Sequence, residues 1–340
     1  MDSRWIASPG VALLGHGLPG TAVDWARAAE RAGLGSLWVI EDYFHPGAFT
    51  LAGAAAAATE RIGIGLGVVN PYTRHPVLLA METAALAGLA PGRVALGLGS
   101  SNRRWIEAQM GLPFKTPLRG LREGVQIVRR LLAGERVTYA GECFAVHDVV
   151  LEAPPPAPVP IVLGVKGPRA LALAAEVADG VHGSILTSPA HVRRVRRSTA
   201  AAGPAFAVIG YVPMAVSAAG HEARARVRPL LARYLGALHG QSILADAGLP
   251  PARTQRFHDA AVAGRPAGDL VTEDMIDTLA VAGTPEQCRR ALERLALAGL
   301  DAPVAVLPGG APVTEQIARL GEILVPAWRE LTAGAPRRPA

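Results

Sequence analysis

The chain has 340 residues, 50% of them apolar and 5% aromatic, so it can bury a large core, and α/β barrels often reach this size as one domain. Its net charge of +6 is compatible with anionic partners, but the basic residues are spread along the chain. The one dense cluster, within residues 193–197, falls in an expected surface helix, so we expect a solvated helix face and no nucleic-acid partner.

Cysteine usage and hydropathy indicate the cellular compartment in which the protein is expected. Cys143 and Cys288 lie far apart and match no metal-binding spacing, so we expect no disulfide and no metal site. We expect no signal peptide, and no apolar run of about 18 residues is free of polar or helix-breaking residues. We therefore expect a soluble, cytoplasmic protein with no membrane partner.

Strand-like and helix-like segments alternate along most of the chain. The expected strands are residues 11–14, 36–40 and 62–66, a segment within 92–101, the two ends of 160–181, a segment from Phe206, and one within 301–310. The expected helices are 21–33 (with Thr21 as N-cap and Gly33 as stop), an alanine-rich stretch up to Arg61, 76–90, 117–132, the middle of 160–181, and segments from Pro189 and from Pro285 after the cap-like Gly283-Thr284.

Two insertions interrupt this alternation. Residues 134–149 look like a β-hairpin, and residues near 221–280 are irregular and mainly helical. The remaining segments form roughly eight strand–helix units, which predicts a parallel α/β sheet closed into a (β/α)8 TIM barrel. We expect one domain over residues 1–340. An open doubly wound sheet is the alternative, but no GxGxxG follows the first strand and eight units are many for that fold.

Polar residues are concentrated at four strand ends, where the chemistry of a barrel takes place. These ends are IEDYFHP (40–46), GVVNPYTRHP (67–76), GLGSSNRRW (97–105) and GVKGPRAL (164–171). Glycine-rich and Asn-Pro turns are often ordinary connections. Four of them at successive strand ends favour a functional site.

In order and spacing, these stretches resemble the bacterial luciferase-like superfamily, and most of all its coenzyme F420-dependent branch of the methylenetetrahydromethanopterin reductase type. KTPLRGLREGVQIVRRLLAGE, GVKGPRALALAAEVADGV and VTEDMIDTLAVAGTPEQC carry the same resemblance, which covers about residues 10–310. It implies a luciferase-like barrel that binds F420, a deazaflavin.

The resemblance also answers why the third strand ends in a polar turn. It implies a bulge with a non-prolyl cis peptide bond between Gly67 and Val68, behind the deazaflavin ring, which bends the ring and exposes one face for hydride transfer. Asn70 then lies where the family hydrogen-bonds the cofactor. A plain strand end is the alternative at this position.

The resemblance places Asp42 at the polar edge of the cofactor ring and Tyr43 where several relatives have an active-site histidine. Tyrosine can donate a hydrogen bond, but with an ordinary pKa of about 10 it is a poor base at pH 7. His45 is a nearby substitute, although a single histidine is more often packed or solvated.

The turn after the fourth strand supplies Ser100 and Ser101, which match cofactor-contacting positions of the family. Asn102 replaces a carboxylate found in several relatives, and asparagine cannot transfer a proton. The candidate catalytic residues are therefore Tyr43, Asn102 and His45. Substrates that need only hydride, such as an iminium, remain the easiest to accommodate.

Lys166, Gly167, Arg169 and Ala170 match the turn that holds the phosphate side of the cofactor. A glycine-proline turn that opens a helix presents free N–H groups and a positive helix terminus to an anion. Lys166 is one of only two lysines in the chain. A surface lysine is the alternative interpretation.

The leading prediction is a coenzyme F420-dependent oxidoreductase that transfers a hydride between the deazaflavin C5 and a small organic substrate of the iminium, enone or alcohol type. An FMN-dependent monooxygenase of the same fold is the alternative, and a cofactor-free binding or regulatory subunit is the second alternative. Retention of Asp42, Gly67-Val68, Asn70 and the Lys166 turn favours an enzyme. Relatives are commonly dimers, so we expect a homodimer, with the apolar helices of residues 48–90 as the candidate interface.

Overall fold

The computed structural model describes residues 3–14 and 19–333. Parallel strands form a closed barrel in which each strand pairs with the next and the last, β11, pairs with β1. The barrel strands are β1 (Gly10–Leu13), β2 (Ser36–Val39), β3 (Gly63–Val69), β4 (Val94–Leu98), β7 (Ile161–Leu163), β8 (Gly180–Gly183), β9 (Ala207–Val216) and β11 (Ala302–Val306). The predicted (β/α)8 barrel is confirmed, and the open-sheet alternative is wrong.

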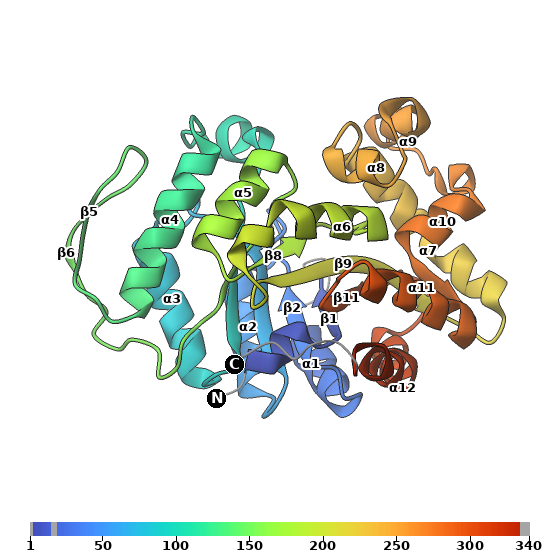
Figure 1. Ribbon diagram of the computed structural model, residues 1–340, viewed down its shortest axis with the longest axis horizontal. Coiled ribbons are helices and arrows are strands. Elements are labelled where there is room, and N and C mark those ends of the chain that lie inside the picture. The colour runs from blue at the N-terminus through green and yellow to red at the C-terminus, as the bar shows by residue number, and fades with distance from the viewer. Residues whose placement is uncertain (1–2, 15–18, 334–340) are drawn as a thin grey trace.

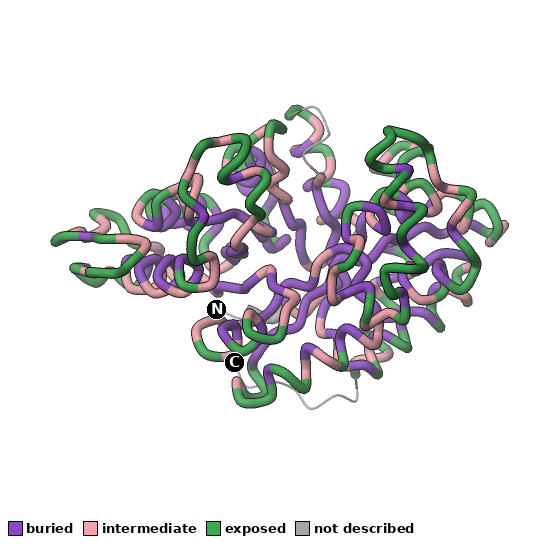
Figure 2. The backbone as a smooth tube through the Cα atoms, turned by 90° about the horizontal axis from the view of Figure 1, so that it is seen from above, coloured by how far each residue is buried: buried purple, intermediate pink, exposed green. Residues whose placement is uncertain are grey.

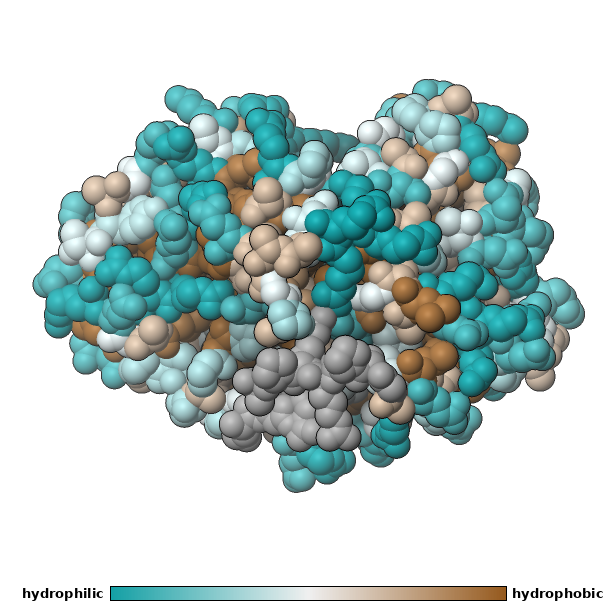
Figure 3. Space-filling model, in the orientation of Figure 1, coloured by the Kyte–Doolittle hydropathy of each residue, from teal (hydrophilic) through white to brown (hydrophobic). Residues whose placement is uncertain are grey.

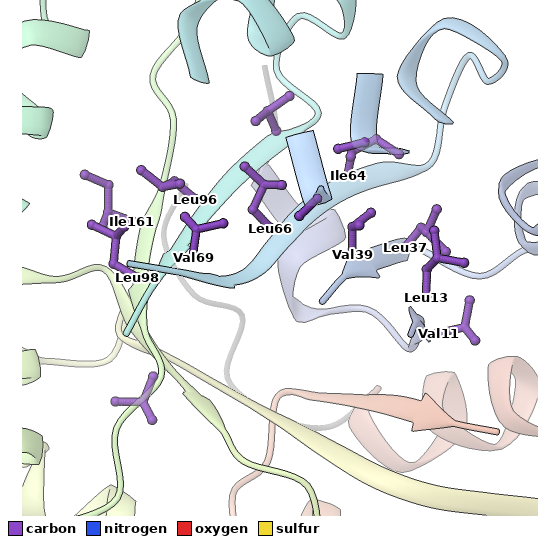
Figure 4. Close-up of a cluster of buried hydrophobic side chains, with 14 of the residues drawn as sticks. Val11, Leu13, Leu37, Val39, Ile64, Leu66, Val69, Leu96, Leu98 and Ile161 are labelled. Carbon is purple, nitrogen blue, oxygen red and sulfur yellow. The ribbon is translucent and has the colours of Figure 1, made fainter. Parts of the chain in front are cut away.

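Helices surround the barrel (Figure 1). They are α1 (Thr21–Arg31), α2 (Ala48–Ala57), α3 (Pro76–Leu89), α4 (Pro117–Leu132), α5 (Pro168–Val177), α6 (Pro189–Ser198), α11 (Pro285–Leu297) and α12 (Val313–Thr332). Because the helices cover the outside and side chains fill the lumen, the strands are buried on both faces and read as continuous apolar runs. Figure 4 shows the outward layer, with Val11 and Leu13 from β1 beside Leu37 and Val39 from β2.

The lumen is filled by large rings, and glycines on β3 make room for them. Gly63, Gly65 and Gly67 alternate along the strand, so all three face inward. A Cβ atom on Gly63 would collide with Trp5, and one on Gly65 with Trp38. The glycines of β3 are therefore explained by close packing inside the barrel.

The two predicted insertions are present. The hairpin of β5 (Val137–Ala140) and β6 (Ala145–Val149) extends from the body at the left of Figure 1, and much of it is exposed in Figure 2. Buried Glu123 on α4 holds its tip, because its carboxylate accepts hydrogen bonds of 2.9–3.0 Å from the backbone N–H groups of residues 142–144. The second insertion contains α7 (Gly220–Ala237), α8 (Ser242–Asp246), α9 (Pro251–Val262) and α10 (Glu273–Leu279).

The long helix α12 and several short elements were not predicted, among them a strand and a π-helical segment. β10 (Val281–Gly283) pairs with the carboxyl end of β9, and the π-helical segment η2 (Arg104–Gln109) follows β4. Both are too short for hydrophobic periodicity to show. The surface seen in Figure 3 is mainly hydrophilic, with separate apolar areas.

Some element ends differ from the prediction. Thr21 is the first residue of α1 and Gly20 is the N-cap, so the predicted cap is wrong, whereas Gly33 follows the helix with a positive φ of 74° as predicted for a stop. The alanine-rich helix ends at Ala57 and not at Arg61. The reason is Glu30, whose Oε1 accepts hydrogen bonds from the backbone N–H groups of residues 60–62 at 2.6–3.1 Å and holds them in a turn. The expected cap at Thr284 is confirmed as a capping box with Gln287.

Candidate active site

The carboxyl ends of the barrel strands meet at one mouth, and closely packed aromatic side chains form its floor. The His182 ring lies between Trp38, at a centroid distance of 4.5 Å, and Tyr211, at 4.0 Å. All three are buried, and burial lowers the pKa of His182 to about 4, so the ring is neutral. The Tyr211 hydroxyl donates a hydrogen bond of 2.6 Å to the carbonyl oxygen of Gly67.

β3 bulges directly above this floor. The Gly67-Val68 peptide bond is cis, and the pairing of β3 with β4 shifts register between Leu66 and Val69, so the predicted cis peptide bond and bulge are both confirmed. The half-buried Val68 side chain lies over a surface of glycines, where Cβ atoms would crowd it. These glycines are Gly97, Gly99 and Gly164. The glycines after β4 and β7 therefore admit the bulge as well as forming turns.

The turn after β3 is held by Asn70, which is 3% exposed. Its Oδ1 accepts hydrogen bonds from the backbone N–H groups of Tyr72, at 2.9 Å, and Thr73, at 3.0 Å. Because backbone N–H groups only donate, these contacts assign Oδ1 to the turn and leave Nδ2 as the donor for a ligand.

The other polar residues of this turn attach it to the scaffold. Arg74 forms ion pairs with Glu41 after β2, at 2.7 Å, and with Glu82 on α3, at 3.2 Å. His75 caps α3, where its Nδ1 accepts a hydrogen bond from the backbone N–H of Val77 at 3.3 Å. The mixture of side-chain types in NPYTRHP therefore serves mainly to fix the turn in place.

Tyr43 and Ser101 lie close together at the mouth. The Tyr43 ring packs edge-on against Trp105 at 5.3 Å. Burial raises the pKa of Tyr43, although the neighbouring Thr73 and Ser101 hydroxyls oppose the shift, so the phenol keeps its proton at neutral pH. Ser101 has a positive φ of 60°, and its buried Oγ forms no hydrogen bond of good geometry among residues 3–14 and 19–333, although the Tyr43 hydroxyl lies nearby. An unpartnered buried hydroxyl is typical of a site that a ligand completes.

Asp42 follows β2 at the same mouth. Its charge contributes, after burial, to the raised pKa of Tyr211 in the lumen and of Tyr234 on α7. These effects indicate that Asp42 lies near both Tyr211 and Tyr234, so α7 of the helical insertion approaches the mouth. The sequence offered no motif for Tyr234, Tyr211 or His182, because their partners lie far away along the chain.

The Lys166 turn follows β7, the strand that pairs with β4. Burial lowers the pKa of Lys166 to about 8, and no carboxylate in the described part of the chain forms an ion pair with its amine. α5 begins immediately after Gly167, whose N-cap position makes no side-chain cap hydrogen bond. Arg169 is exposed and Ala170 half-buried in the first turn of α5. The site combines an unpaired cation with an uncapped helix N-terminus, which suits a phosphate group.

The remaining predicted residues are more exposed. His45 is exposed in the loop after β2, and Ser100 is half-buried beside Ser101. Asn102 is exposed, and its Oδ1 accepts a hydrogen bond of 3.1 Å from the backbone N–H of Trp105, so it holds the start of η2. The fold brings the predicted residues to one mouth, with Tyr43 more enclosed than His45 or Asn102.

A family model described as luciferase-like monooxygenase matches residues 5–302. The chain belongs to the luciferase-like monooxygenase family. It is 29% identical over 318 residues to 5,10-methylenetetrahydromethanopterin reductase of Archaeoglobus fulgidus, and this alignment covers 89% of this chain and 94% of that protein. It is 40% identical over 164 residues to F420-dependent glucose-6-phosphate dehydrogenase of Beutenbergia cavernae, and this alignment covers 45% of this chain and 48% of that enzyme.

The fold of this luciferase-like chain matches the solved structure of coenzyme F420-dependent tetrahydromethanopterin reductase from Methanopyrus kandleri. The TM-score is 0.83 at 24% identity, over 94% of this chain and 99% of that one. The resemblance seen in the strand ends is confirmed. Within residues 3–14 and 19–333, no helix is long and apolar enough to cross a membrane, and no group of three or more His, Cys, Asp or Glu side chains is placed to hold a metal ion.

Proposed function

We propose that this protein is a coenzyme F420-dependent oxidoreductase that transfers a hydride between the deazaflavin C5 and a small organic substrate. The observation that carries the proposal is the set of unpartnered groups around the bulge. Among the described residues, the Ser101 hydroxyl forms no hydrogen bond of good geometry, the Lys166 amine forms no ion pair, and α5 has no side-chain cap, and all three lie at one mouth of the barrel. Relatives matched over nearly their full length are named as reductases, in support of this reaction class.

The residues present fit a flat cofactor with an anionic tail. Val68 on the bulge would support the ring, and the Asn70 amide and the hydroxyls of the 100–101 turn would donate hydrogen bonds to it. Asp42 would contact its polar edge. The phosphate would lie against Lys166, with Gly167, Arg169 and Ala170 supplying the helix terminus. Bound F420 supplies the carbon that exchanges hydride, and the protein supplies orientation and exclusion of water.

Tyr43 is the proton donor that we propose among the three catalytic candidates. Its hydroxyl keeps its proton at neutral pH and lies at the mouth beside Thr73 and Ser101. Asn102 cannot transfer a proton, and its side-chain oxygen already accepts a backbone hydrogen bond. His45 remains a proposed contributor from the exposed loop. Reduction of an enone or a carbonyl needs such a donor, whereas reduction of an iminium does not.

A paired titration of the purified protein with F420 and with FMN, followed by fluorescence quenching, tests the proposal. Selective binding of F420 supports it, and turnover is then sought with reduced F420 and imines, enones and ketones. Selective binding of FMN would instead favour the monooxygenase alternative, which the description of the family model keeps open. Binding of neither cofactor would contradict the enzymatic assignment.

We also propose a homodimer that packs through α2 and α3. α2 contains no charged residue, and α3 contains only Glu82. A helix that is apolar all round normally lies in a buried environment, yet Leu78, Met81 and Leu89 are 46%, 52% and 57% exposed on α3. A second copy of the chain would cover this face.

The free thiols of Cys143 and Cys288 are consistent with the proposed cytoplasmic location and with one domain that forms no disulfide.

A further inference from the structure

A cleft of 500 Å³ lies between the tip of the hairpin and the loop that leads into α4. It is lined by Tyr72 from the turn after β3, by residues of the loop 112–116, and by hairpin residues 142–144. Pockets that take a small organic molecule have volumes of about 300–1,000 Å³. The cleft is therefore large enough for such a ligand, and none of the predicted cofactor residues lines it.

The two sides of the cleft are fixed to one another. Buried Glu123 on α4 accepts the backbone hydrogen bonds of the hairpin tip, and Arg119 on the same helix forms an ion pair with Glu142. Thr116 Oγ1 lies 3.1 Å from Cys143 Sγ. These contacts join the loop and α4 to the hairpin, so the cleft is formed before any ligand arrives.

The walls of the cleft are mainly apolar and aromatic. The Tyr72 ring packs edge-on against buried Phe114 at a centroid distance of 5.2 Å, and it lies 6.3 Å from the ring of Phe144. Tyr72 and Phe144 are each half-buried and line the cleft together with Leu112 and Pro113. Because packing against these neighbours fixes the rings, the walls suit a flat apolar molecule.

The cleft also has one cation without an anionic partner. Lys115 is exposed and forms no ion pair with any carboxylate of residues 3–14 and 19–333. The carboxylate that lines the cleft, Glu142, is already paired with Arg119. Burial raises the pKa of Tyr72 to about 12, so its phenol is neutral at pH 7. The charge of the cleft therefore favours a ligand with a single anionic group.

We propose that this cleft binds a flat aromatic carboxylate, with its ring against Tyr72 and Phe144 and its carboxylate against Lys115. Burial of the ring and a charge-assisted contact with the amine both stabilise the complex. A neutral aromatic molecule would leave Lys115 unpaired, and a small inorganic anion would leave the aromatic walls in water. The site is separate from the proposed cofactor site, although the backbone N–H of Tyr72 also donates to Oδ1 of Asn70.

Cys143 reports whether the cleft is occupied. It lines the cleft and is half-buried, whereas Cys288, the only other cysteine of the chain, is 1% exposed. Iodoacetamide should therefore alkylate the folded protein at Cys143 alone, and mass spectrometry measures the rate. We expect 2-naphthoate to slow this alkylation in a saturable way. 2-Naphthamide, which has the same ring and no charge, should need a higher concentration for the same protection.

These measurements use the unaltered protein, so they do not depend on the folding of a variant. No alkylation of Cys143, no protection by 2-naphthoate, or equal protection by 2-naphthamide would each overturn the proposal.

Lys115→Met tests the contact with the carboxylate. The concentration of 2-naphthoate that gives half-protection should rise about 2–5-fold, the value of an exposed ion pair, and that of 2-naphthamide should not change. Arg256→Met removes an exposed cation from α9 and is the matched control, which should behave like the natural sequence. Unchanged protection by 2-naphthoate in Lys115→Met would overturn the proposal.

Calorimetric titration with 2-naphthoate checks the place of binding. We expect one site per chain in the natural protein and no binding after Cys143 has been carbamidomethylated, because the added group occupies the cleft. 2-Naphthoate that still binds to the modified protein would bind elsewhere, which would overturn the proposal. F420 takes no part in these measurements, so their outcome is independent of the proposed function.

Discussion

The Tyr211 hydroxyl donates a hydrogen bond of 2.6 Å to the carbonyl oxygen of Gly67, across 144 positions of the chain. Gly67 opens the cis peptide bond on which the proposed cofactor would rest, so a side chain of the lumen fixes the bulge from below. A Cβ atom on Gly67 would collide with this hydroxyl and crowd Trp38, which explains why glycine occupies the position.

Tyr211→Phe should therefore destabilise the protein and weaken F420 binding. The variant leaves the buried Gly67 carbonyl without its donor, which costs about 1–3 kcal/mol. Urea unfolding and a fluorescence titration with F420 measure the two effects. Tyr139→Phe is the matched control, because it removes a hydroxyl that donates to Gln126 beside the hairpin, far along the chain from the bulge. Equal losses in both variants would argue against a special role for the Tyr211 contact.

Lys166→Met should raise the dissociation constant of F420 about 10–100-fold, the value of a lost charge-assisted hydrogen bond. Because the pKa of Lys166 is about 8, affinity of the natural sequence should also fall as pH rises above 8 and the amine loses its charge. Lys115→Met, which removes the only other lysine, is the control. A Lys166→Met variant that binds F420 normally but turns over slowly would contradict the phosphate role.

Tyr43→Phe should lower kcat about 100-fold or more for a substrate that needs a proton, with a small effect on an iminium. The phenol is protonated at neutral pH because burial raises its pKa, so the rate should not fall until the solution is strongly basic. His45→Gln and Asn102→Ala serve as comparisons. Should His45→Gln abolish turnover while Tyr43→Phe does not, the proton donor would be reassigned to the exposed loop.

Glu30→Gln should destabilise the amino end of β3 by about 1–3 kcal/mol, because its carboxylate accepts hydrogen bonds from three successive backbone N–H groups. Burial alone would raise the pKa of Glu30, but these N–H groups and Arg61 lower it below the ordinary 4.5. The contribution of the Glu30 carboxylate to the free energy of unfolding is therefore present above pH 4.5 and is lost as pH falls through the lowered pKa of Glu30.

Thermal unfolding of the Glu30→Gln variant between pH 3 and 7 checks this sign. The stability difference from the natural sequence should shrink toward the acid end of the range. Glu60→Gln alters a side chain that is 87% exposed and should leave the unfolding temperature unchanged. A pH-independent difference for Glu30→Gln would show that charge at this position is irrelevant.

Met81→Glu should convert the proposed dimer to a monomer, because it places a charge at the centre of the apolar α3 face. Size-exclusion chromatography with light scattering measures the mass directly. Val262→Glu, at a position on α9 that is 75% exposed, is the control and should not change the mass. A natural protein that is monomeric at micromolar concentration would contradict the proposed interface.

Most of the elements and the location of the site could be predicted from local pattern. Alternating segments indicated a parallel barrel, and the carboxyl ends of parallel strands meet at one mouth whatever the details of packing. The turn residues after β2, β3, β4 and β7 were therefore identified as site residues before their positions in space were known. Of the missed elements, β10 and η2 have three and six residues, too few to show a period, whereas the 20 residues of α12 lie beyond the last segment that the pattern assigned.

The partners of these residues were decided by the tertiary structure. Periodicity tells which face of a strand is buried but not which distant side chain meets it, so the contacts of Tyr211 with Gly67 and of Asp246 with His191 had no signal in the sequence. The same holds for half-buried Lys166, since one lysine in a turn reads as a surface residue until side chains of α6 and α8 hold its backbone carbonyl. Local propensity determined the elements and their order, whereas long-range packing determined which polar groups were left without partners and so became available to a ligand.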